Sequence, residues 1–292
     1  MVFSKSPEKT VLLLLNTSGY LDETMITDLT RTDLHLIRLH GVVDEEDGVI
    51  SARTPTNPTY RWGNFLLLPA PPQASDLEHL VRRATAKLKD QPESLHAMIR
   101  WDGDSICPEL ESHASRLGLQ NDPGMAMRAT RMEPIRTPGV TIRQINFDND
   151  WPDIECLNRT CDPLEMQGES DYVLFKKRLR DSWRVWAEES TVSWWGGFME
   201  GRLVGQLGLV CCPNGLGRLQ SVETHPDFRR RGVCTTLVAH VVHHALQGED
   251  CNEVVLGIEP KSDASRIYHK LGFALEEWQH GLVIIDASTI GS

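Results

Sequence analysis

Apolar residues along the chain recur with the period of a helix in some stretches and of a strand in others. The stretch after Ser75 shows the helical period most clearly, with apolar residues at Leu77, Leu80, Val81, Ala84 and Leu88. Ser75 and Glu78 also have the spacing of a capping box at a helix start. On the same grounds the sequence predicts further helices over Ile26–His40, Pro108–Leu117, Trp151–Cys161, Tyr172–Glu188, Val233–Leu246 and Asp263–Leu271.

Shorter apolar runs between these helices predict strands. Glu200-Gly201 lies between two such runs and is a good hairpin turn, and Asp44–Gly48 has the composition of an acidic turn. A hairpin followed by strand–helix–strand–helix–strand implies an α/β fold with a mixed sheet. The predicted strands cover Asn64–Leu68, His96–Trp101, Val140–Ile145, Thr191–Met199, Arg202–Val210, Arg218–Glu223, Glu253–Ile258 and Gly281–Ile285.

A proline-containing segment, Met132–Gly139, interrupts these patterns near the middle of the chain. Pro134, Pro138 and Gly139 favour an extended linker over a helix or a strand. With 292 residues the chain is long enough for two domains of ordinary size. We therefore expect one domain over residues 1–132 and a second over residues 139–292.

The composition is that of an acidic globular protein. Hydrophobic residues make up 40% of the chain, charged residues 24%, and the formal net charge is −11 at pH 7. This charge argues against a general binder of nucleic acid, which needs a basic face. The seven cysteines lack the spacing of a disulfide framework, and no apolar run has the length of a membrane span. We expect a cytoplasmic protein with free thiols and with neither nucleic-acid nor membrane partners.

The segment from Leu219 to Cys234 carries the clearest chemical signal. A predicted strand ends there, a short turn at Pro226 follows, and an arginine-rich loop with Gly232 opens a long helix. The first N–H groups of a helix have no partner within it, and the helix dipole is positive at that end. Such a helix start binds a pyrophosphate, with Gly232 allowing close approach and Arg229, Arg230 and Arg231 supplying positive charge.

This segment resembles the signature of the GNAT acetyltransferase superfamily, Gln/Arg-x-x-Gly-x-Gly/Ala. Arg229, Gly232 and Cys234 occupy the three defined positions, with Cys234 in place of Gly or Ala. A second segment, Pro260–Phe273, is similar to the family's Asn-x-x-Ala-x-x-Leu-Tyr-x-Lys-x-Gly-Phe element. It matches at Ala264, Tyr268, Lys270, Gly272 and Phe273, while Lys261 replaces the usual Asn and Ile267 replaces Leu.

The resemblance implies a mixed, mainly antiparallel sheet flanked by helices, and acetyl-CoA as cosubstrate without a metal. It implies that Val222 and its neighbours offer backbone groups to the acetyl carbonyl and the pantetheine. The residues that it assigns to cofactor binding are Val222, Glu223, Thr224, Arg229, Arg230, Arg231, Gly232, Val233, Cys234, Lys261 and Tyr268.

Acyl transfer to an amine needs a base, because an amine with a pKa of ~10.4 is almost fully protonated at neutral pH. Glu223, on the strand beside the expected acetyl site, is the candidate base; the alternative is a solvent-facing carboxylate. His225 could relay protons, or it could be a turn residue before Pro226. By resemblance Tyr268 protonates the departing CoA sulfur; the alternative is a tyrosine that only fills the core.

Two further groups of residues have structural and functional interpretations. His240, His243 and His244 on the long helix could share a metal, but packed or solvated histidines are favoured. Trp183, Trp186, Trp194 and Trp195 are expected to pack in the core, and the alternative is an aromatic wall for a cationic acceptor. A covalent route through Cys234 is disfavoured, because the family transfers the acetyl group directly.

The N-terminal half resembles the degenerate lobe of tandem GNAT proteins. Leu117-Gly118-Leu119 aligns with Leu271-Gly272-Phe273, which places Ala114 at the position of Tyr268. Pro69-Ala70-Pro71-Pro72 stands where the arginine–glycine loop should be, and prolines remove the N–H donors that a phosphate needs. We expect no CoA site in this half; an unrelated small α/β domain is the alternative.

These observations lead to one principal hypothesis and one alternative. The principal hypothesis is an acetyl-CoA-dependent N-acetyltransferase that acts on a primary amine of a small molecule or a peptide, as a monomer or homodimer. The alternative is a non-catalytic acyl-CoA-binding or sensor protein on the same fold, which would lack the roles assigned to Tyr268 and Glu223. A DNA-binding regulator is disfavoured by the net charge of −11.

Overall fold

The computed structural model describes residues 26–103, 105–167, 169–189, 191–248, 251–259 and 262–287. In the N-terminal half the elements are, in chain order, α1 (Asp28–Arg38), β1 (Val42–Glu46), β2 (Val49–Arg53), the 3-10 helix η2 (Arg61–Gly63), β3 (Phe65–Leu67), η3 (Ala74–Asp76), α2 (Leu77–Lys87), β4 (Ala97–Asp102), α3 (Pro108–Arg116), β5 (Gln120–Asn121) and β6 (Gly124–Ala129). In the C-terminal half they are β7 (Thr141–Gln144), α4 (Phe147–Cys161), α5 (Pro163–Gln167), α6 (Ser170–Ala187), β8 (Val192–Met199), β9 (Arg202–Cys212), η4 (Pro213–Gly215), β10 (Leu216–Thr224), η5 (Pro226–Phe228), α7 (Val233–Gln247), β11 (Glu253–Ile258), α8 (Asp263–Leu271) and β12 (Ala274–Ile284).

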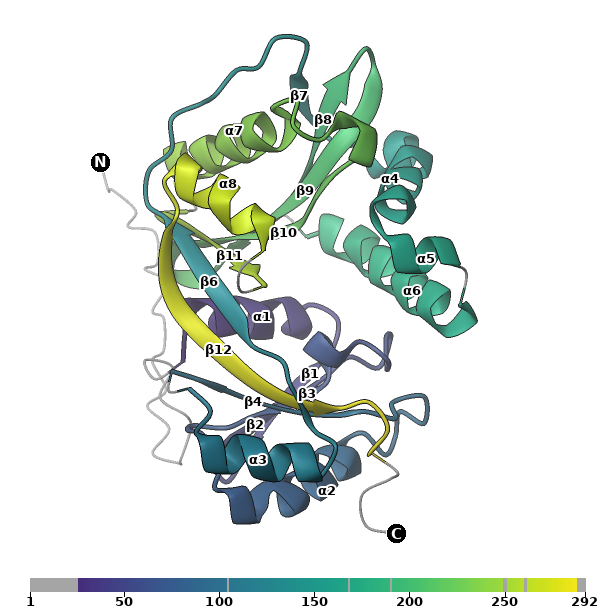
Figure 1. Cartoon of the computed structure of the whole chain (residues 1–292). Helices are drawn as coiled ribbons and strands as arrows, with labels where there is room; N and C mark the ends of the chain where they lie inside the picture. The colour runs from purple at the N-terminus through teal and green to yellow at the C-terminus, as the bar shows by residue number, and fades with distance from the viewer. Residues whose placement is uncertain are drawn as a thin grey trace, which may run out of the picture.

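Within the described residues a 12-stranded sheet runs through the molecule, with helices on its faces (Figure 1). The strand order is β1-β2-β3-β4-β12-β6-β11-β10-β9-β8-β7, and β5 pairs with β12 beside this path. The pairs β3–β4 and β10–β11 are parallel, and the remaining pairs between described strands are antiparallel. The predicted mixed, mainly antiparallel sheet flanked by helices is confirmed.

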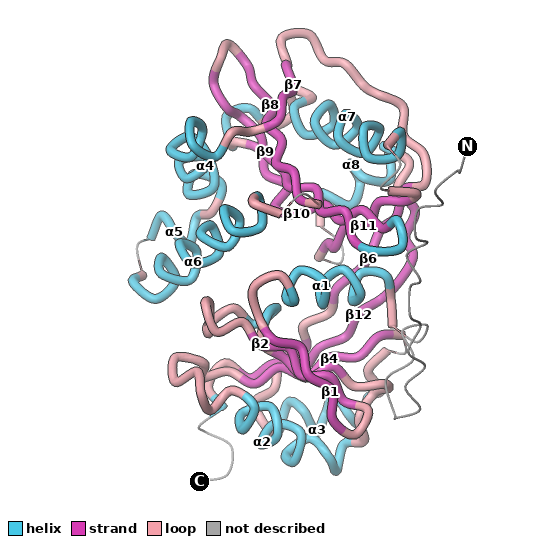
Figure 2. Tube along the Cα trace, turned by 180° about the vertical axis from the view of Figure 1, so that it is seen from behind, coloured by secondary structure: helices cyan, strands magenta, loops and turns pink. Residues whose placement is uncertain are grey.

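The two halves of the chain repeat one arrangement of elements, which the tube in Figure 2 shows from behind. β1, β2 and β3 are antiparallel neighbours, α2 follows, and β4 returns parallel to β3. β8, β9, β10, α7 and β11 do the same in the C-terminal half. The next helix, α3 or α8, ends alike in both halves. Leu119 N donates to Ala114 O at 2.9 Å, as Phe273 N donates to Tyr268 O at 3.0 Å.

The halves also exchange strands at their junction. β6 precedes the linker in the chain, yet it lies between β11 and β12 and pairs with both. β12 first pairs with β6 and then continues to pair with β4, as the long yellow strand in Figure 1 shows. The segment between residues 132 and 139 therefore separates the two halves along the chain but not within the sheet. One strand from each half, β6 and β12, pairs with strands of the other half.

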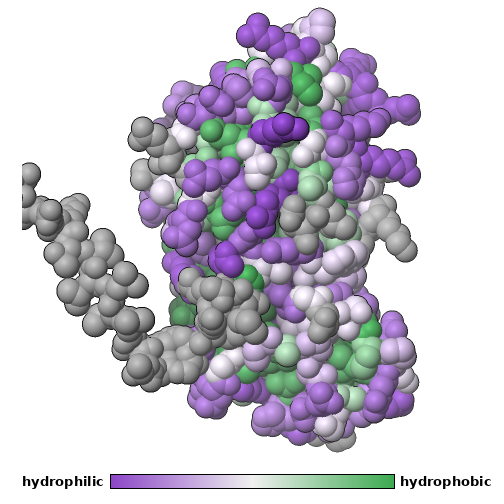
Figure 3. All heavy atoms as spheres, turned by 90° about the vertical axis from the view of Figure 1, so that its left-hand side faces the viewer, coloured by the Kyte–Doolittle hydropathy of each residue, from purple (hydrophilic) through white to green (hydrophobic). Residues whose placement is uncertain are grey.

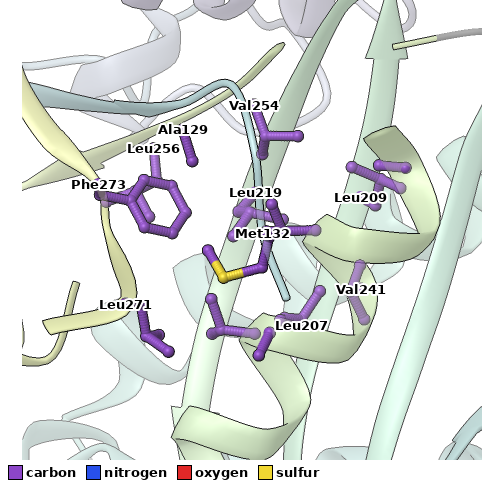
Figure 4. Packing of buried hydrophobic residues seen from close by; sticks show 14 of the residues in the cluster. Ala129, Met132, Leu207, Leu209, Leu219, Val241, Val254, Leu256, Leu271 and Phe273 are labelled. Carbon is purple, nitrogen blue, oxygen red and sulfur yellow. The ribbon is translucent and has the colours of Figure 1, made fainter. Parts of the chain in front are cut away.

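Each face of the C-terminal half has its own hydrophobic core. α7 lies on one face, where Leu237 and Val241 pack with Leu207, Leu219 and Phe273; Figure 4 shows part of this cluster. α4 and α6 lie on the other face, and their cluster includes Ile154, Leu157, Trp183, Trp186 and Trp194. α7 and the helices α4–α6 thus lie on opposite faces of β8–β10.

Trp183, Trp186, Trp194 and Trp195 are buried, as the interpretation that they pack in the core predicts. Trp183 and Trp194 contact each other on the α6 face, with 4.9 Å between ring centroids and the rings tilted by 30°. Trp195 points to the α7 face, where His240 and His244 lie 5.5 and 5.0 Å from it. His243 contacts the Met132 carbonyl at 2.8 Å, so the three histidines have packing partners.

Three local predictions differ from the structure. The capping box at Ser75 does not form, because η3 precedes α2 and the cap residue is Asp76, with no side-chain bond to the helix. Asp44–Glu46 lies in β1 and not in a turn; the hairpin turn is at Asp47-Gly48, where both φ angles are positive. β6 was not predicted, because Gly124–Ala129 lacks alternation and β-branched residues and is buried on both sides.

The face of the molecule in Figure 3 is mainly hydrophilic, and its apolar residues lie in small separate groups. Among the described helices none combines the length and the apolar character needed to cross a bilayer.

Candidate active site

β10 and β11 separate part-way along their length. Their parallel register covers Leu216–Arg218 on β10, but β10 continues to Thr224 and β11 to Ile258. In the same stretch the pairing of β10 with β9 has a bulge between Gln220 and Glu223, where Ser221 has a φ of 48°. The facing backbone edges beyond Arg218 are therefore outside the β10–β11 ladder, and the two strands form an open V.

The start of α7 lies next to this V and has the geometry of an anion site. Gly232 is the N-cap with a φ of 79°, which favours glycine, and Arg230 has a φ of 63°. The first helical bond runs from Thr236 N to Gly232 O, so the preceding N–H groups point out of the helix end. Arg229, Arg230 and Arg231 are all exposed around it.

Gly232 also meets the linker. A Cβ at this position would lie 2.5 Å from Thr137 Oγ1, and Thr137 is held in place by a 2.8 Å hydrogen bond from Thr236. The sequence had suggested that Gly232 serves close approach of an anion. In the structure this glycine is also required by its own backbone angle and by the packing of the linker against α7.

The three arginines are not equivalent. Arg229 donates from Nε to the Thr224 carbonyl at 3.3 Å, which ties the loop back to the end of β10. Arg231 lies over the Phe228 ring at 5.1 Å.

Burial raises the pKa of the Cys234 thiol to about 11, so Cys234 is a neutral thiol and not a nucleophilic thiolate at neutral pH.

Glu223 is partly buried just after the bulge and accepts hydrogen bonds from two fully buried amides. Asn158 Nδ2 donates to Oε1 at 2.6 Å, and Gln206 Nε2 donates to Oε2 at 2.7 Å. Burial raises the pKa of the Glu223 carboxyl, while the Gln206 bond, Lys176 and the Asn158 bond act in the opposite direction. Each carboxylate oxygen keeps a further lone pair for a proton or a water.

A buried ionic network supports this carboxylate from α4, α5 and α6. Arg180 donates to Asn158 Oδ1 at 2.9 Å and to Glu165 Oε2 at 2.8 Å. Lys176, one turn earlier on α6, pairs with Asp162 at 3.0 Å. The network orients Asn158, which in turn fixes Glu223, so the second layer of the site comes from the helices that precede β8 in the chain.

Tyr268 is only 5% exposed and packs on the α7 side of the sheet. Its ring meets Phe273 edge-on with 5.6 Å between centroids. Burial, and to a lesser degree the Cys234 thiol, raise the pKa of the Tyr268 hydroxyl, so it keeps its proton at neutral pH. The structure therefore brings Tyr268 close to the start of α7. Lys261 lies outside the described residues.

His225 is buried and engaged in the turn that follows β10. Its Nδ1 accepts from Asp227 N at 3.2 Å at the start of η5, and Arg202 contacts its Nε2 at 2.8 Å. These contacts support the interpretation of His225 as a turn residue.

A cavity of about 330 Å³ lies where the V meets the N-terminal half. Gln220 and Gly257 line it from β10 and β11, Trp186 from α6, and Tyr60 and Trp62 from the loop before β3. Its charged lining residues are Asp33, Arg61, Asp122, Arg218 and Glu259. Asp33 and Arg218 pair with each other at 3.2 Å, whereas Asp122 Oδ2 is buried and has no hydrogen-bond partner among the described residues.

Comparison with known proteins bears on the same segments. A family model described as the acetyltransferase (GNAT) family matches residues 151–273, which include the V, the α7 start and Tyr268. This region belongs to the GNAT family. No curated protein matches the sequence.

Solved structures share the fold of most of the chain. A functionally unknown conserved protein from Staphylococcus epidermidis superposes with a TM-score of 0.69 over 83% of this chain and 93% of its own, at 14% identity. A GCN5-related N-acetyltransferase from Kribbella flavida gives 0.62 over 87% and 93%, at 12% identity. A GCN5-related N-acetyltransferase from Sphaerobacter thermophilus gives 0.53 over 82% of both chains, at 14% identity. At such identities the likeness shows the fold alone.

Sequence reasoning missed the residues that surround Glu223 in this GNAT region. Asn158 and Gln206 lie in predicted elements but in no signature, and a single sequence does not show which carboxylate they will face. One signal was available: Lys176, Arg180 and Trp183 are spaced along one face of α6, so basic residues share its apolar face. Buried basic residues need partners, which points to carboxylates beneath this helix.

Proposed function

We propose that this protein transfers the acetyl group of acetyl-CoA to a primary amine of a small molecule or a peptide. The observation that carries the proposal is the V between β10 and β11, which has the α7 start on one side and Glu223 at the bulge. Residues 151–273, which match the GNAT family model, contain all of these elements, so the fold and the local geometry both support acetyl transfer.

The residues at the α7 start fit a CoA pyrophosphate. The helix begins with N–H groups free to donate, Gly232 takes the left-handed conformation that exposes them, and exposed arginines surround them. The open edges of β10 and β11 offer backbone donors and acceptors to a pantetheine arm, with Val222 and Thr224 on the β10 side. Acetyl-CoA brings the activated thioester; the chain binds it, orients it and moves protons.

Glu223 and Tyr268 suit the two proton transfers. Glu223 is oriented by two amides and has a raised pKa, which brings its basicity closer to neutral pH. Its carboxylate accepts the proton of the amine, directly or through a water. Tyr268 remains protonated and lies near the start of α7, where it donates to the thiolate that leaves.

The cavity between the halves is the proposed site for the acceptor. It opens on Gln220 and Gly257, at the separated part of β10 and β11, so a molecule in it reaches the acetyl position from the α6 face. The buried, unpartnered Oδ2 of Asp122 suits a cationic group of that molecule. An amine acceptor fits this lining, and the positive charge of Arg61 suits a carboxylate or phosphate on the same acceptor.

A thiol-release assay with acetyl-CoA against a panel of amines tests the proposal. Release above the hydrolysis background with at least one amine, reduced in Glu223→Gln, is expected. A protein that binds acetyl-CoA but releases no thiol with any small-molecule or peptide amine would instead be the non-catalytic acyl-CoA-binding protein.

A further inference from the structure

A second cavity, of about 650 Å³, lies between α6 and the N-terminal half. It shares Tyr60, Arg61 and Trp62 with the cavity at the V, so these three residues line both this outer cavity and the inner cavity at the V. Tyr60 contacts both sides: its ring stacks on Phe175 of α6 with 5.9 Å between centroids, and burial, helped by the charge of Asp33 at the inner cavity, raises the pKa of its hydroxyl to about 12.

From this continuity we infer that the outer cavity holds an apolar segment of the acceptor, whose amine lies in the inner cavity. The substrate class is therefore an elongated primary amine with an alkyl or aryl group at the end opposite the amine. The inference rests on the proposed N-acetyltransferase function and adds that the N-terminal half selects the acceptor.

The lining of the outer cavity supports an apolar occupant. Leu95, Leu174 and Ile285 are 60%, 40% and 53% exposed, although they are large apolar side chains, and all three line this cavity. Tyr172 and Phe175 add aromatic surface from α6. Apolar side chains that are gathered around one cavity gain free energy when an apolar group displaces the water there.

The segment of Tyr60, Arg61 and Trp62 that lines both cavities is held in one conformation, as a recognition loop requires. Asn64 is fully buried, and its Nδ2 donates to the carbonyls of Asn57 at 3.1 Å and Tyr60 at 2.8 Å. Thr54 N donates to Asn64 Oδ1 at 2.8 Å, which closes the loop. Such a satisfied buried polar network fixes one loop conformation.

The loop is also joined to α6, as the proximity of α6 to the loop before β3 in Figure 1 shows. Asn57 Nδ2 donates to the Phe175 carbonyl at 3.2 Å. Arg178 forms a two-bond pair with Glu93 at 2.7 and 3.0 Å at the rim of the outer cavity. The N-terminal half and α6 thus form one continuous wall for an acceptor, from the V to the outer cavity.

Binding of two probe amines to the full chain saturated with CoA tests the inference. 4-Phenylbutylamine carries the apolar ring that n-butylamine lacks, and calorimetry measures both. We expect 4-phenylbutylamine to bind at least about tenfold more tightly, because one apolar group in a pocket is worth about 10- to 200-fold. Leu174→Glu should abolish this preference and leave the affinity for n-butylamine unchanged.

Val185→Glu is the matched control, because Val185 is 49% exposed on the same helix and lines neither cavity. It should keep the preference, and Leu95→Glu should lose it from the opposite wall. Equal affinities of the two amines in the natural protein, or an equal loss for both in Leu174→Glu, overturn the inference. Preferential binding without thiol release from acetyl-CoA would support the cavity assignment and refute the N-acetyltransferase function.

Discussion

The two halves share an order of elements but differ where β10 in one half and β3 in the other meet their parallel neighbours. In the C-terminal half, β10 continues to Thr224 after its last parallel pair at Arg218. In the N-terminal half, β3 ends at Leu67, and Leu68 N still bonds to the Arg100 carbonyl on β4 at 2.8 Å. The C-terminal half therefore has an open V at this place, and the N-terminal half has a closed ladder.

The difference extends to the residues around the junction. Leu66 and Leu68 are buried in the core beside β4, whereas the corresponding end of β10 carries Gln220 and Glu223. The loop after β3 contains Pro69, Pro71 and Pro72, which have no N–H to donate. Ala114 fills the position of Tyr268. A groove between two strands requires that ladder hydrogen bonds and apolar packing be given up, and of these two junctions the one at β10 and β11 does so.

The largest expected effect is the loss of CoA binding in Gly232→Asp. The new side chain would meet Thr137 within 2.5 Å, would be strained at a φ of 79°, and would place a negative charge at the anion site. We expect calorimetry with CoA to show at least a ~100-fold loss of affinity, about two tenfold steps of binding free energy. Gly118→Asp, at a φ of 76° in the other half, is the matched control. It should lower stability without changing CoA affinity.

The comparison also predicts the stoichiometry. Because the N-terminal half has a closed ladder and a proline run, calorimetry should give one CoA per chain. Two sites per chain would mean that the closed ladder opens in solution.

Tyr268→Phe should separate catalysis from packing. The ring keeps its contact with Phe273 while the proton donor is lost, so kcat should fall by ~10²–10⁴-fold with CoA affinity nearly unchanged. Steady-state kinetics and calorimetry check this. Tyr268→Ala, in contrast, should also lower the melting temperature. A natural kcat in Tyr268→Phe, with product release shown not to limit the rate, would assign this tyrosine to the core alone, like Ala114.

Glu223→Gln should have a smaller effect, which is clearest in the pH profile. The carboxyl must be ionised to accept a proton, so kcat falls as pH decreases through its pKa. Because burial raises this pKa, the fall should begin at higher pH than for an ordinary glutamate, whose pKa is ~4.3. In Glu223→Gln the acid limb should disappear. Glu277→Gln, another carboxyl whose pKa burial raises, is the control and should keep the limb. A retained limb in both variants would assign the proton to another group.

Much of the local structure follows from the sequence. The spans predicted for β11 and α8, Glu253–Ile258 and Asp263–Leu271, agree with the structure, because each is a single run between turn residues. The Glu200-Gly201 hairpin also forms, with φ angles of 51° and 77°. The loop from Arg229 to Cys234 opens α7 as predicted. These features depend on neighbours in the chain, so periodicity and turn chemistry report them.

What the sequence by itself determined is thus the set of elements and the two signature segments; the tertiary structure decided how they are joined. The placement of β6 between β11 and β12 depends on which distant edges are free to pair, and its own residues carry no mark of that choice. The amides on Glu223 and the wall of Tyr60, Arg61 and Trp62 likewise come from segments far apart in the chain. Burial and pairing between distant segments are properties of the whole fold, and no local pattern encodes them.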